Sequence, residues 1–388
     1  MYHQERDTPM LSKQTDAPIA SPSRRDILRG MAGLLVTMSL GGCAQALSSS
    51  STPTPTPTPR RPGSLLYTYR GHTNRILTVA WSPNGKYIAS GSLDKTVQVW
   101  ASNPSDHFQP YIYRGHTAGV QTVTWSPDSN RVASGAIDKT VQVWDALNGE
   151  HVAIYTGHTD AVNTLAWSPN GNSIATGAAD NTVRLWEVAT GKQMYVYRGH
   201  RASVNSIVWS PDSQQIASGS ADKTVHILDA MTGNHRYTYR GHTDTVSSVS
   251  WSPDGKYIAS GSWDKTVQVW NAVTGAVLYT YNGYNVQAAV NPSKGVLPDL
   301  IFFVAWSPNG KRIAAITQVY CGDVCAVVLG WDAYTQSNFT FWVDEPIFAM
   351  AWSPDDTRLV TSIVNSEQGT EHLSVQPPDG NFAQISQA

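Results

Sequence analysis

Histidine, a serine or threonine, and aspartate recur together at fixed spacing in five segments of this 388-residue chain. A serine nucleophile, an imidazole base and an orienting carboxylate are the groups that catalyse acyl transfer, so the pattern raises the question of a hydrolase. Each set occupies the same offsets and most end in a tryptophan. The sets are His72, Ser90, Asp94 and Trp100; His116, Ser134, Asp138 and Trp144; His158, Thr176, Asp180 and Trp186; His200, Ser218 and Asp222; and His242, Ser260, Asp264 and Trp270.

Repetition of the set argues against catalysis and for a structural role. One set would suffice for an enzyme, and no oxyanion-hole element accompanies these residues. The same side chains could form a buried hydrogen-bond network, because a carboxylate accepts, an imidazole can donate and accept, and an indole only donates. Leu228 takes the tryptophan position in the fourth set, so we expect Ser218 to lose one partner.

No other catalytic or ligand-binding motif stands apart from these sets. The sequence shows no glycine-rich phosphate loop, no cluster of metal-ligand residues and no isolated pair of carboxylates. We therefore expect no catalytic residues, no cofactor and no metal site, and we predict that the protein is not an enzyme.

The elements that would position these side chains belong to a repeat marked by Trp-Ser-Pro. Gly-His begins ten residues before this tripeptide in the first five units. Within the first unit, β-branched runs at 76–81, 87–90 and 96–100 are separated by turn signals, and an outer run covers 67–70. Each unit therefore predicts four short strands. The tripeptide's tryptophans are Trp81, Trp125, Trp167, Trp209, Trp251, Trp306 and Trp352.

A 42-residue unit with Gly-His near its start and Trp-Asp near its end resembles the WD-repeat family. The resemblance covers roughly residues 64–376 and is closest in the first five units. It implies an all-β fold, a single seven-bladed β-propeller of four-stranded antiparallel blades in residues 64–388. It also implies that the recurring polar residues form the buried network. Either residues 65–70 or residues 382–386 could supply the last outer strand, and we favour the former.

Signals of export and anchoring precede the repeats. Two adjacent arginines, Arg24 and Arg25, followed by the apolar run 30–42 are typical of an export signal. They resemble a twin-arginine signal, with general secretory export as the alternative. Residues 40–43, Leu-Gly-Gly-Cys, resemble a bacterial lipobox, which implies lipidation of Cys43. Residues 1–43 would then be the signal, and the Ser/Thr/Pro-rich residues 44–63 a disordered linker.

These signals predict a lipid-anchored protein at the bacterial cell surface or on the periplasmic side of a membrane; they leave open whether the cell has one membrane or two. We expect a monomer that touches the membrane only through Cys43. The net charge of −2 lacks the basic excess of a nucleic-acid binder, so we predict no nucleic-acid partner. In an exported chain we also predict a disulfide between Cys321 and Cys325.

Positions that vary among otherwise similar repeats are the candidates for binding. The family resemblance places them on one face, the top face. The turn between the second and third strands of each unit lies there, as does the turn from the outer strand to the first strand of the next unit. Trp263 leads, because aromatic side chains are common hot spots; neutral variation at exposed turns is the alternative. Lys294, in an insertion before Trp306, is a further binding candidate. The candidates before each recurring aspartate are Leu93, Ile137, Ala179, Ala221 and Trp263, and those after Gly-His include Arg75, Asp160 and Asp244.

The functional hypothesis is a non-catalytic, membrane-anchored extracytoplasmic scaffold that binds a protein or peptide of unknown identity through its top face. One alternative is an envelope glycan-binding or assembly module, because residues 251–256, Trp-Ser-Pro-Asp-Gly-Lys, also resemble TolB-like propellers. Another is an accessory subunit of an exported enzyme. Basic residues near the top face could attract an acidic partner or form a solvated ring of local ion pairs.

Overall fold

The computed structural model describes residues 67–150, 152–282, 298–320, 324–335, 338–343, 347–365 and 370–376. The chain divides into residues 1–44 and 45–388, and all described residues belong to the second part. Their regular structure is strand, apart from the short 3-10 helix Pro104–Asp106. Over these residues, no helix has the length and apolar character to span a lipid bilayer. The predicted all-β class is confirmed.

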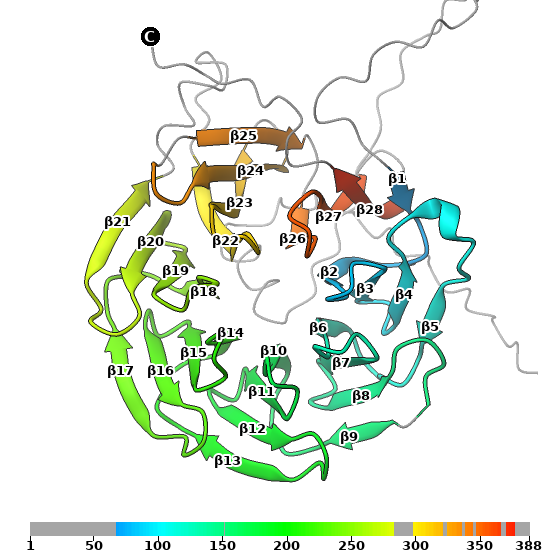
Figure 1. The fold of residues 1–388 in the computed structure, drawn as a ribbon, viewed down its shortest axis with the longest axis horizontal. Helices are drawn as coiled ribbons and strands as arrows, with labels where there is room; N and C mark the ends of the chain where they lie inside the picture. Colours follow the sequence, from blue (N-terminus) through cyan, green and yellow to red (C-terminus); the bar gives the residue numbers. More distant parts are fainter. Residues whose placement is uncertain are drawn as a thin grey trace, which may run out of the picture. The chain divides into compact units, whose positions relative to one another are not determined.

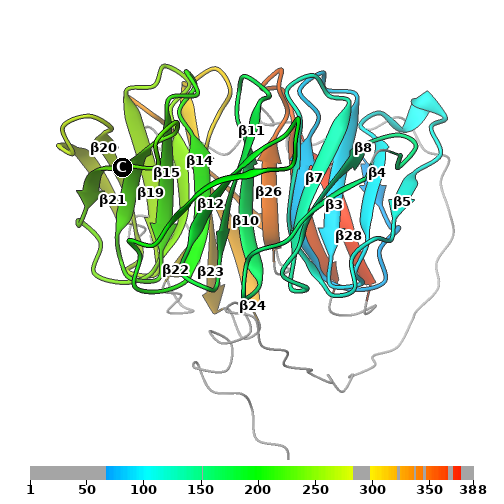
Figure 2. The same ribbon diagram turned by 90° about the horizontal axis from the view of Figure 1, so that it is seen from below.

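The described strands form seven four-stranded antiparallel sheets, which lie around a central axis like the blades of a propeller (Figure 1). Seen from the side, the strands run roughly along that axis (Figure 2). Blade one consists of β2 (Ile76–Trp81), β3 (Tyr87–Ser92), β4 (Val97–Ala101) and β5 (Tyr111–Tyr113). Blade two consists of β6 (Val120–Trp125), β7 (Arg131–Ala136), β8 (Val141–Asp145) and β9 (Ala153–Tyr155). Blade three consists of β10 (Val162–Trp167), β11 (Ser173–Ala178), β12 (Val183–Glu187) and β13 (Gln193–Tyr197).

The remaining blades follow the same order from the inner to the outer strand. Blade four consists of β14 (Val204–Trp209), β15 (Gln215–Ser220), β16 (Val225–Asp229) and β17 (His235–Tyr239). Blade five consists of β18 (Val246–Trp251), β19 (Tyr257–Ser262), β20 (Thr266–Asn271) and β21 (Val277–Asn282). Blade six consists of β22 (Pro298–Trp306), β23 (Arg312–Tyr320), β24 (Val324–Asp332) and β25 (Asn338–Val343). Blade seven consists of β26 (Ile347–Trp352), β27 (Leu359–Asn365), β28 (Thr370–Gln376) and β1 (Tyr67–Tyr69).

Blade seven combines both ends of the described chain. Strand β1 pairs with β28 in antiparallel register, with Thr68 opposite Ser374. The outer strand therefore comes from the N-terminal side, as we favoured. Residues 382–386, the other candidate, lie outside the described residues.

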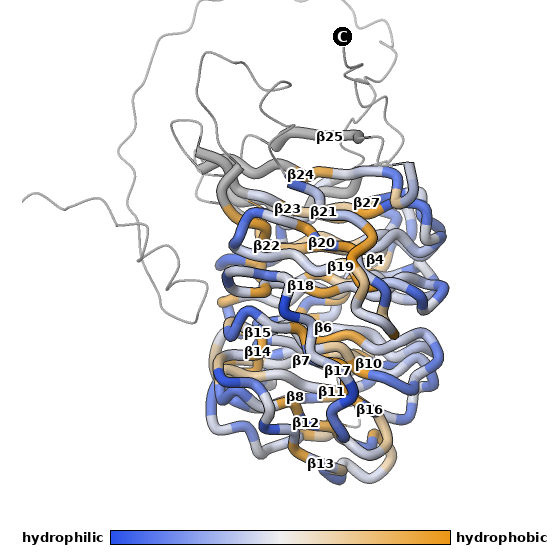
Figure 3. The backbone as a smooth tube through the Cα atoms, turned by 90° about the vertical axis from the view of Figure 1, so that its left-hand side faces the viewer, coloured by the Kyte–Doolittle hydropathy of each residue, from blue (hydrophilic) through white to orange (hydrophobic). Residues whose placement is uncertain are grey.

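The apolar core lies between neighbouring blades, where β-branched side chains of one blade meet the inner strand of the next. Val97 and Val99 of blade one pack with Val120 and Trp125 of blade two, and all four are buried. Burial of this kind contributes about 25 cal/mol for each Å² of apolar surface removed from water. Hydrophobic stretches lie within the strands, whereas hydrophilic stretches mark the loops at both edges (Figure 3).

Inner strands of neighbouring blades are also joined by polar contacts. The Nε1 of Trp125 donates to the carbonyl of Ala80 at 3.1 Å, and the Nε1 of Trp209 donates to that of Ala166 at 3.0 Å. The backbone N–H of Val123 donates to Oγ1 of Thr78 at 3.2 Å. Such bonds hold one blade in register with the next.

Blade six departs from the repeat in one way that the sequence did not predict. Trp331 follows Trp306 by 25 positions, whereas Trp100 follows Trp81 by 19. Both β23 and β24 are nine residues long and pair as far as Tyr320 opposite Val324, so much of this extra length extends a hairpin. Cys321, Lys294 and Cys43 lie outside the described residues, so the disulfide and the lipid anchor stay predictions.

Candidate functional site

The recurring polar residues of blade one meet in a continuous chain of hydrogen bonds. The Nδ1 of His72 lies 2.8 Å from Oδ2 of Asp94, and its Nε2 lies 2.8 Å from Oγ of Ser90. The Nε1 of Trp100 donates to the same hydroxyl at 3.3 Å. Because an ionised carboxylate can only accept, Nδ1 is the donor to Asp94.

The histidine–aspartate contact recurs in the first five blades at 2.8–2.9 Å, and the five imidazoles are at most 1% exposed. The hydroxyl-bearing residues beside them are fully buried, including Ser90 and Thr176. A hydroxyl without access to solvent cannot attack a substrate. These five sets therefore act within the structure and offer no nucleophile.

Hydrogen bonds keep the five aspartates ionised. Burial alone would raise the pKa of Asp264, but bonds from His242, Thr266 and the backbone N–H of Thr243 lower it to about 2. The same causes hold the pKa of Asp222 well below its usual range. The carboxylates stay charged at neutral pH and anchor the loops that lead into each blade.

Among the first five blades, two lack the hydrogen bond from an indole at the end of the hydrogen-bond chain. In blade four Leu228 replaces the tryptophan, as the sequence indicated. In blade two Trp144 is buried, but within the described residues its Nε1 has no hydrogen-bond partner. This corrects the expectation for Trp144. Its ring stacks on Tyr113, with 3.8 Å between centroids and an angle of 6°, as that of Trp100 stacks on Tyr69.

The sequence analysis missed two further polar positions: a threonine two residues after each of the five aspartates and a glutamine in blades one, two and five. The Oγ1 of Thr96 donates to Asp94 at 2.6 Å, and the Nε2 of Gln98 donates to the carbonyl of Gly71 at 3.1 Å. The hydroxyl of Tyr69, from the neighbouring blade, donates to Oε1 of Gln98 at 2.8 Å. A comparison of the repeats at fixed offsets after each aspartate would have found this threonine and this glutamine.

The two sets of variable turn residues lie together. The backbone N–H of Leu93, in the turn between β3 and β4, donates to the carbonyl of Arg75, in the turn between β1 and β2, at 2.8 Å. The equivalent bond recurs in the next four blades, with Ile137, Ala179, Ala221 and Trp263 as donors. Both kinds of turn therefore share one edge of the blades, and this edge is the top face.

Exposure divides the binding candidates into two groups. Arg75, Asp160 and Asp244 are exposed, whereas the residues before each aspartate are half-buried. Leu93 packs on the next blade, because a Cβ added to Gly119 would lie 2.6 Å from its Cδ2.

Trp263 differs from our expectation of an exposed aromatic. It is half-buried, and its Nε1 is enclosed without a hydrogen-bond partner among the described residues. The exposed charged residues of the top face are therefore better placed for contact with a ligand than Trp263.

Blade four carries a pocket of about 310 Å³ beside the altered chain. His226 stands where blades one, two and five have glutamine, and its ring stacks on His200 with 3.9 Å between centroids. The hydroxyl of Tyr197, from β13 of blade three, lies 2.8 Å from Nδ1 of His226. Across the pocket, the Nε2 of His235 lies 2.7 Å from Oγ1 of Thr238.

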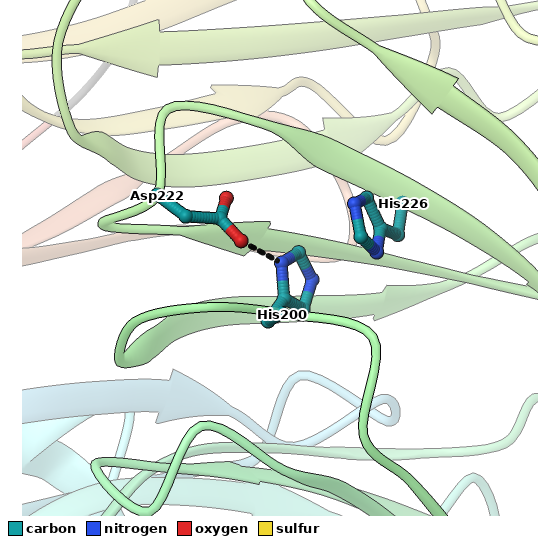
Figure 4. Close-up of side chains that lie close together, drawn as sticks. All are labelled: His200, Asp222 and His226. Atoms are coloured by element: carbon teal, nitrogen blue, oxygen red, sulfur yellow. Dashed lines mark hydrogen bonds and ion pairs between the residues drawn. The ribbon is translucent and has the colours of Figure 1, made fainter.

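His200, Asp222 and His226 bring three potential metal ligands within 4.8 Å of one another, a group that the sequence analysis did not predict (Figure 4). Their atoms are already engaged, however. The two imidazole nitrogens of His200 face Asp222 at 2.9 Å and Ser218 at 2.8 Å, so a metal would have to displace the buried chain. Burial, and then the neighbouring His200, lower the pKa of His226 to about 3, so this imidazole is neutral at pH 7.

Comparison with known proteins finds one family in the first five units. The family described as "WD domain, G-beta repeat" matches residues 63–101, 109–145, 149–187, 191–229 and 233–271. These ranges include every aspartate–histidine chain described above.

Similar curated proteins match over single repeats. A 41-residue segment is 49% identical to a "Protein HIRA homolog" of Drosophila melanogaster, covering 11% of this chain and 4% of that protein. A 37-residue segment is 54% identical to "Actin-interacting protein 1" of the same fly, covering 9% and 6%. A 39-residue segment is 44% identical to "THO complex subunit 3" of Arabidopsis thaliana, covering 10% and 12%. The chain thus matches only a small part of each relative's length.

Proposed function

Because this chain belongs to the WD40 repeat β-propeller family, we propose that it is a non-catalytic scaffold that binds a protein or peptide through its top face. Members of this family are typically protein-binding scaffolds and usually lack catalytic activity. We also propose that its seven sheets close into one seven-bladed ring, with β1 and β28 joining the two ends of the chain. Fold alone does not fix a function, so the proposal depends on the top face.

One observation carries the proposal: exposed side chains of differing charge stand on turns that the backbone holds in place. Arg75, Asp160 and Asp244 occupy similar turns of blades one, three and five and are exposed. Each turn is tied to its partner turn by a backbone hydrogen bond of 2.8–2.9 Å. Rigid turns with varied side chains lose little conformational entropy when they bind, which favours recognition of another molecule.

We further propose that the propeller is held outside the cytoplasm by a lipid on Cys43, in a bacterial cell. The support is the sequence of residues 24–43, in which paired arginines and an apolar run precede Leu-Gly-Gly-Cys. The Ser/Thr/Pro-rich linker would then separate the blades from the membrane.

Site-specific photocrosslinking in cells tests the binding proposal. A photoreactive residue would replace Asp160 or Asp244 on the top face and, as the matched control, Lys86 in the turn at the opposite end of β2. We expect a protein adduct from the top-face positions that the Lys86 position does not give. Identical adducts from both faces would contradict the proposal.

The same preparations separate the alternatives. Retention of envelope glycans by the purified chain, without a protein adduct, would favour a glycan-binding module. Turnover of a substrate that requires a co-purified enzyme would favour an accessory subunit.

Fractionation tests the anchor. The native chain should enter the membrane fraction, and Cys43→Ala should release it into the soluble fraction. Membrane association that persists in Cys43→Ala would contradict lipid anchoring at this cysteine.

A further inference from the structure

The pocket of blade four carries an arginine that the other closely matched repeats lack. Arg201 lines it from the turn after His200, at a position where the other closely matched repeats have threonine. Arg240 lines it from the end of β17. Both arginines are exposed, and neither forms an ion pair with any residue that the structure describes. The threonines at the position of Arg201 are Thr73, Thr117, Thr159 and Thr243.

Among the described residues that line the pocket, Asp222 is the one carboxylate, so it offsets one of the two arginine charges and leaves a net positive charge. Asp222 accepts hydrogen bonds from His200, from the backbone N–H of Arg201 at 2.9 Å and from Thr224. Its oxygens therefore serve the buried chain, as do those of its counterparts in the other blades. His226 is a neutral imidazole and adds no positive charge.

From this geometry we infer that the blade-four pocket binds a small oxyanion, a carboxylate or phosphate group, between Arg201 and Arg240. A planar guanidinium presents paired N–H donors that match two oxygens of such a group. A volume of about 310 Å³ accommodates such a group together with part of the molecule that carries it. The two arginines of the lining outweigh the single charge of Asp222, so the pocket favours an anion over a metal cation on His226.

The inference deepens the proposed function, because it names the chemistry of a ligand that the propeller could recognise at its edge. It rests on the proposed function only for the source of the anion. The pocket itself can be tested without a partner.

Titration of the full-length chain with inorganic phosphate and, separately, with sodium acetate provides the test. The readout is the nuclear magnetic resonance signal of the His226 and His235 side chains, at constant ionic strength to keep screening equal. We expect one of the two anions or both to shift these signals saturably.

The double variant Arg201→Thr/Arg240→Gln should weaken binding about tenfold or more, since two charge-assisted contacts are lost. Arg201→Thr restores the residue of the other repeats, so the fold should tolerate it. The matched control is Arg114→Gln, which removes the arginine equivalent to Arg240 from blade one and should bind as the native chain does. Thermal unfolding checks that all three chains are folded.

Three results would overturn the inference: no saturable shift with either anion, an equal shift in the double variant, or a shift with zinc chloride alone. Displacement of the bound anion is then measured with a peptide that contains aspartate and with one that contains phosphoserine. The peptide that displaces the anion shows whether a carboxylate or a phosphate is its source. Anion binding without a top-face crosslink would leave the pocket intact and remove the scaffold proposal, so the two can fail separately.

Discussion

Blades four and five have equivalent strands and an equivalent buried histidine. They differ at the indole end of the hydrogen-bond chain. In blade five, Trp270 donates to Ser260 at 3.1 Å and stacks on Tyr239, with 4.3 Å between ring centroids. In blade four, Leu228 makes neither contact, and the hydroxyl of Tyr197 contacts the imidazole of His226, where that of Tyr239 contacts Gln268. Two substitutions in β16, His226 and Leu228, thus accompany the replacement of a tyrosine–tryptophan stack by a pocket.

The comparison shows that the two ends of the hydrogen-bond chain have different roles. The aspartate end is the same in both blades, because it holds the turn that leads into the blade. The indole end varies, since blades two and four lack its hydrogen bond while their strands remain paired. We infer that the aspartate end secures the fold and that the indole end can be altered to make a site.

The largest effect is expected from Trp270→Leu, which gives blade five the residue of blade four. The indole is fully buried, so its loss should lower the free energy of unfolding by about 3 kcal/mol. The matched change in blade four, Leu228→Met, roughly conserves volume and should cost less than about 1.5 kcal/mol. Chemical denaturation measures both, and equal losses would contradict the distinction between the blades.

Removal of the aspartate charge should affect the two blades equally. Asp264→Asn and Asp222→Asn each lose charge-assisted bonds to a histidine, a threonine and a backbone N–H, and we expect about 2 kcal/mol for each. Denaturation curves of the two single variants provide the comparison. A much smaller loss of stability in Asp222→Asn would show that the hydrogen-bond chain is one cooperative unit, which Leu228 has already weakened in blade four.

A smaller effect depends on pH and belongs to blade four alone. The pKa of His226 is about 3 in the folded chain and near 6.5 when unfolded, so below pH 6.5 the unfolded chain binds a proton that the folded chain does not. Acidification from pH 7 to pH 5 should therefore destabilise the native chain by up to about 2 kcal/mol more than His226→Gln. The aspartates with lowered pKa values protonate in the unfolded chain only near pH 4, below this window.

Urea denaturation at pH 7, 6 and 5 measures this difference. Parallel losses of stability in the native chain and in His226→Gln would show that His226 accepts a proton in the folded chain as readily as in the unfolded chain.

Repetition explains why so much of the fold was predictable. The spacing of Gly-His, aspartate and Trp-Ser-Pro predicted the strands, because each blade contains the same local pattern of apolar runs and turns. It also indicated the polar residues that the structure brings together, such as His72 with Asp94, because groups that recur at fixed offsets occupy equivalent places in every sheet. Blade six lacks that pattern, so its long hairpin could not be anticipated.

The sequence by itself determined the strand order, the repeated polar chain and the break at Leu228, since these depend on residues within one unit. Only the tertiary structure decided that Trp144 lacks its hydrogen bond, that Trp263 is half-buried and that a pocket lies beside His226. That pocket is lined by Tyr197 from one blade and Arg201, His226 and Arg240 from the next turn and sheet. The distances between these residues depend on how two blades pack. That packing depends on side-chain shapes, which the spacing of the repeats does not reveal.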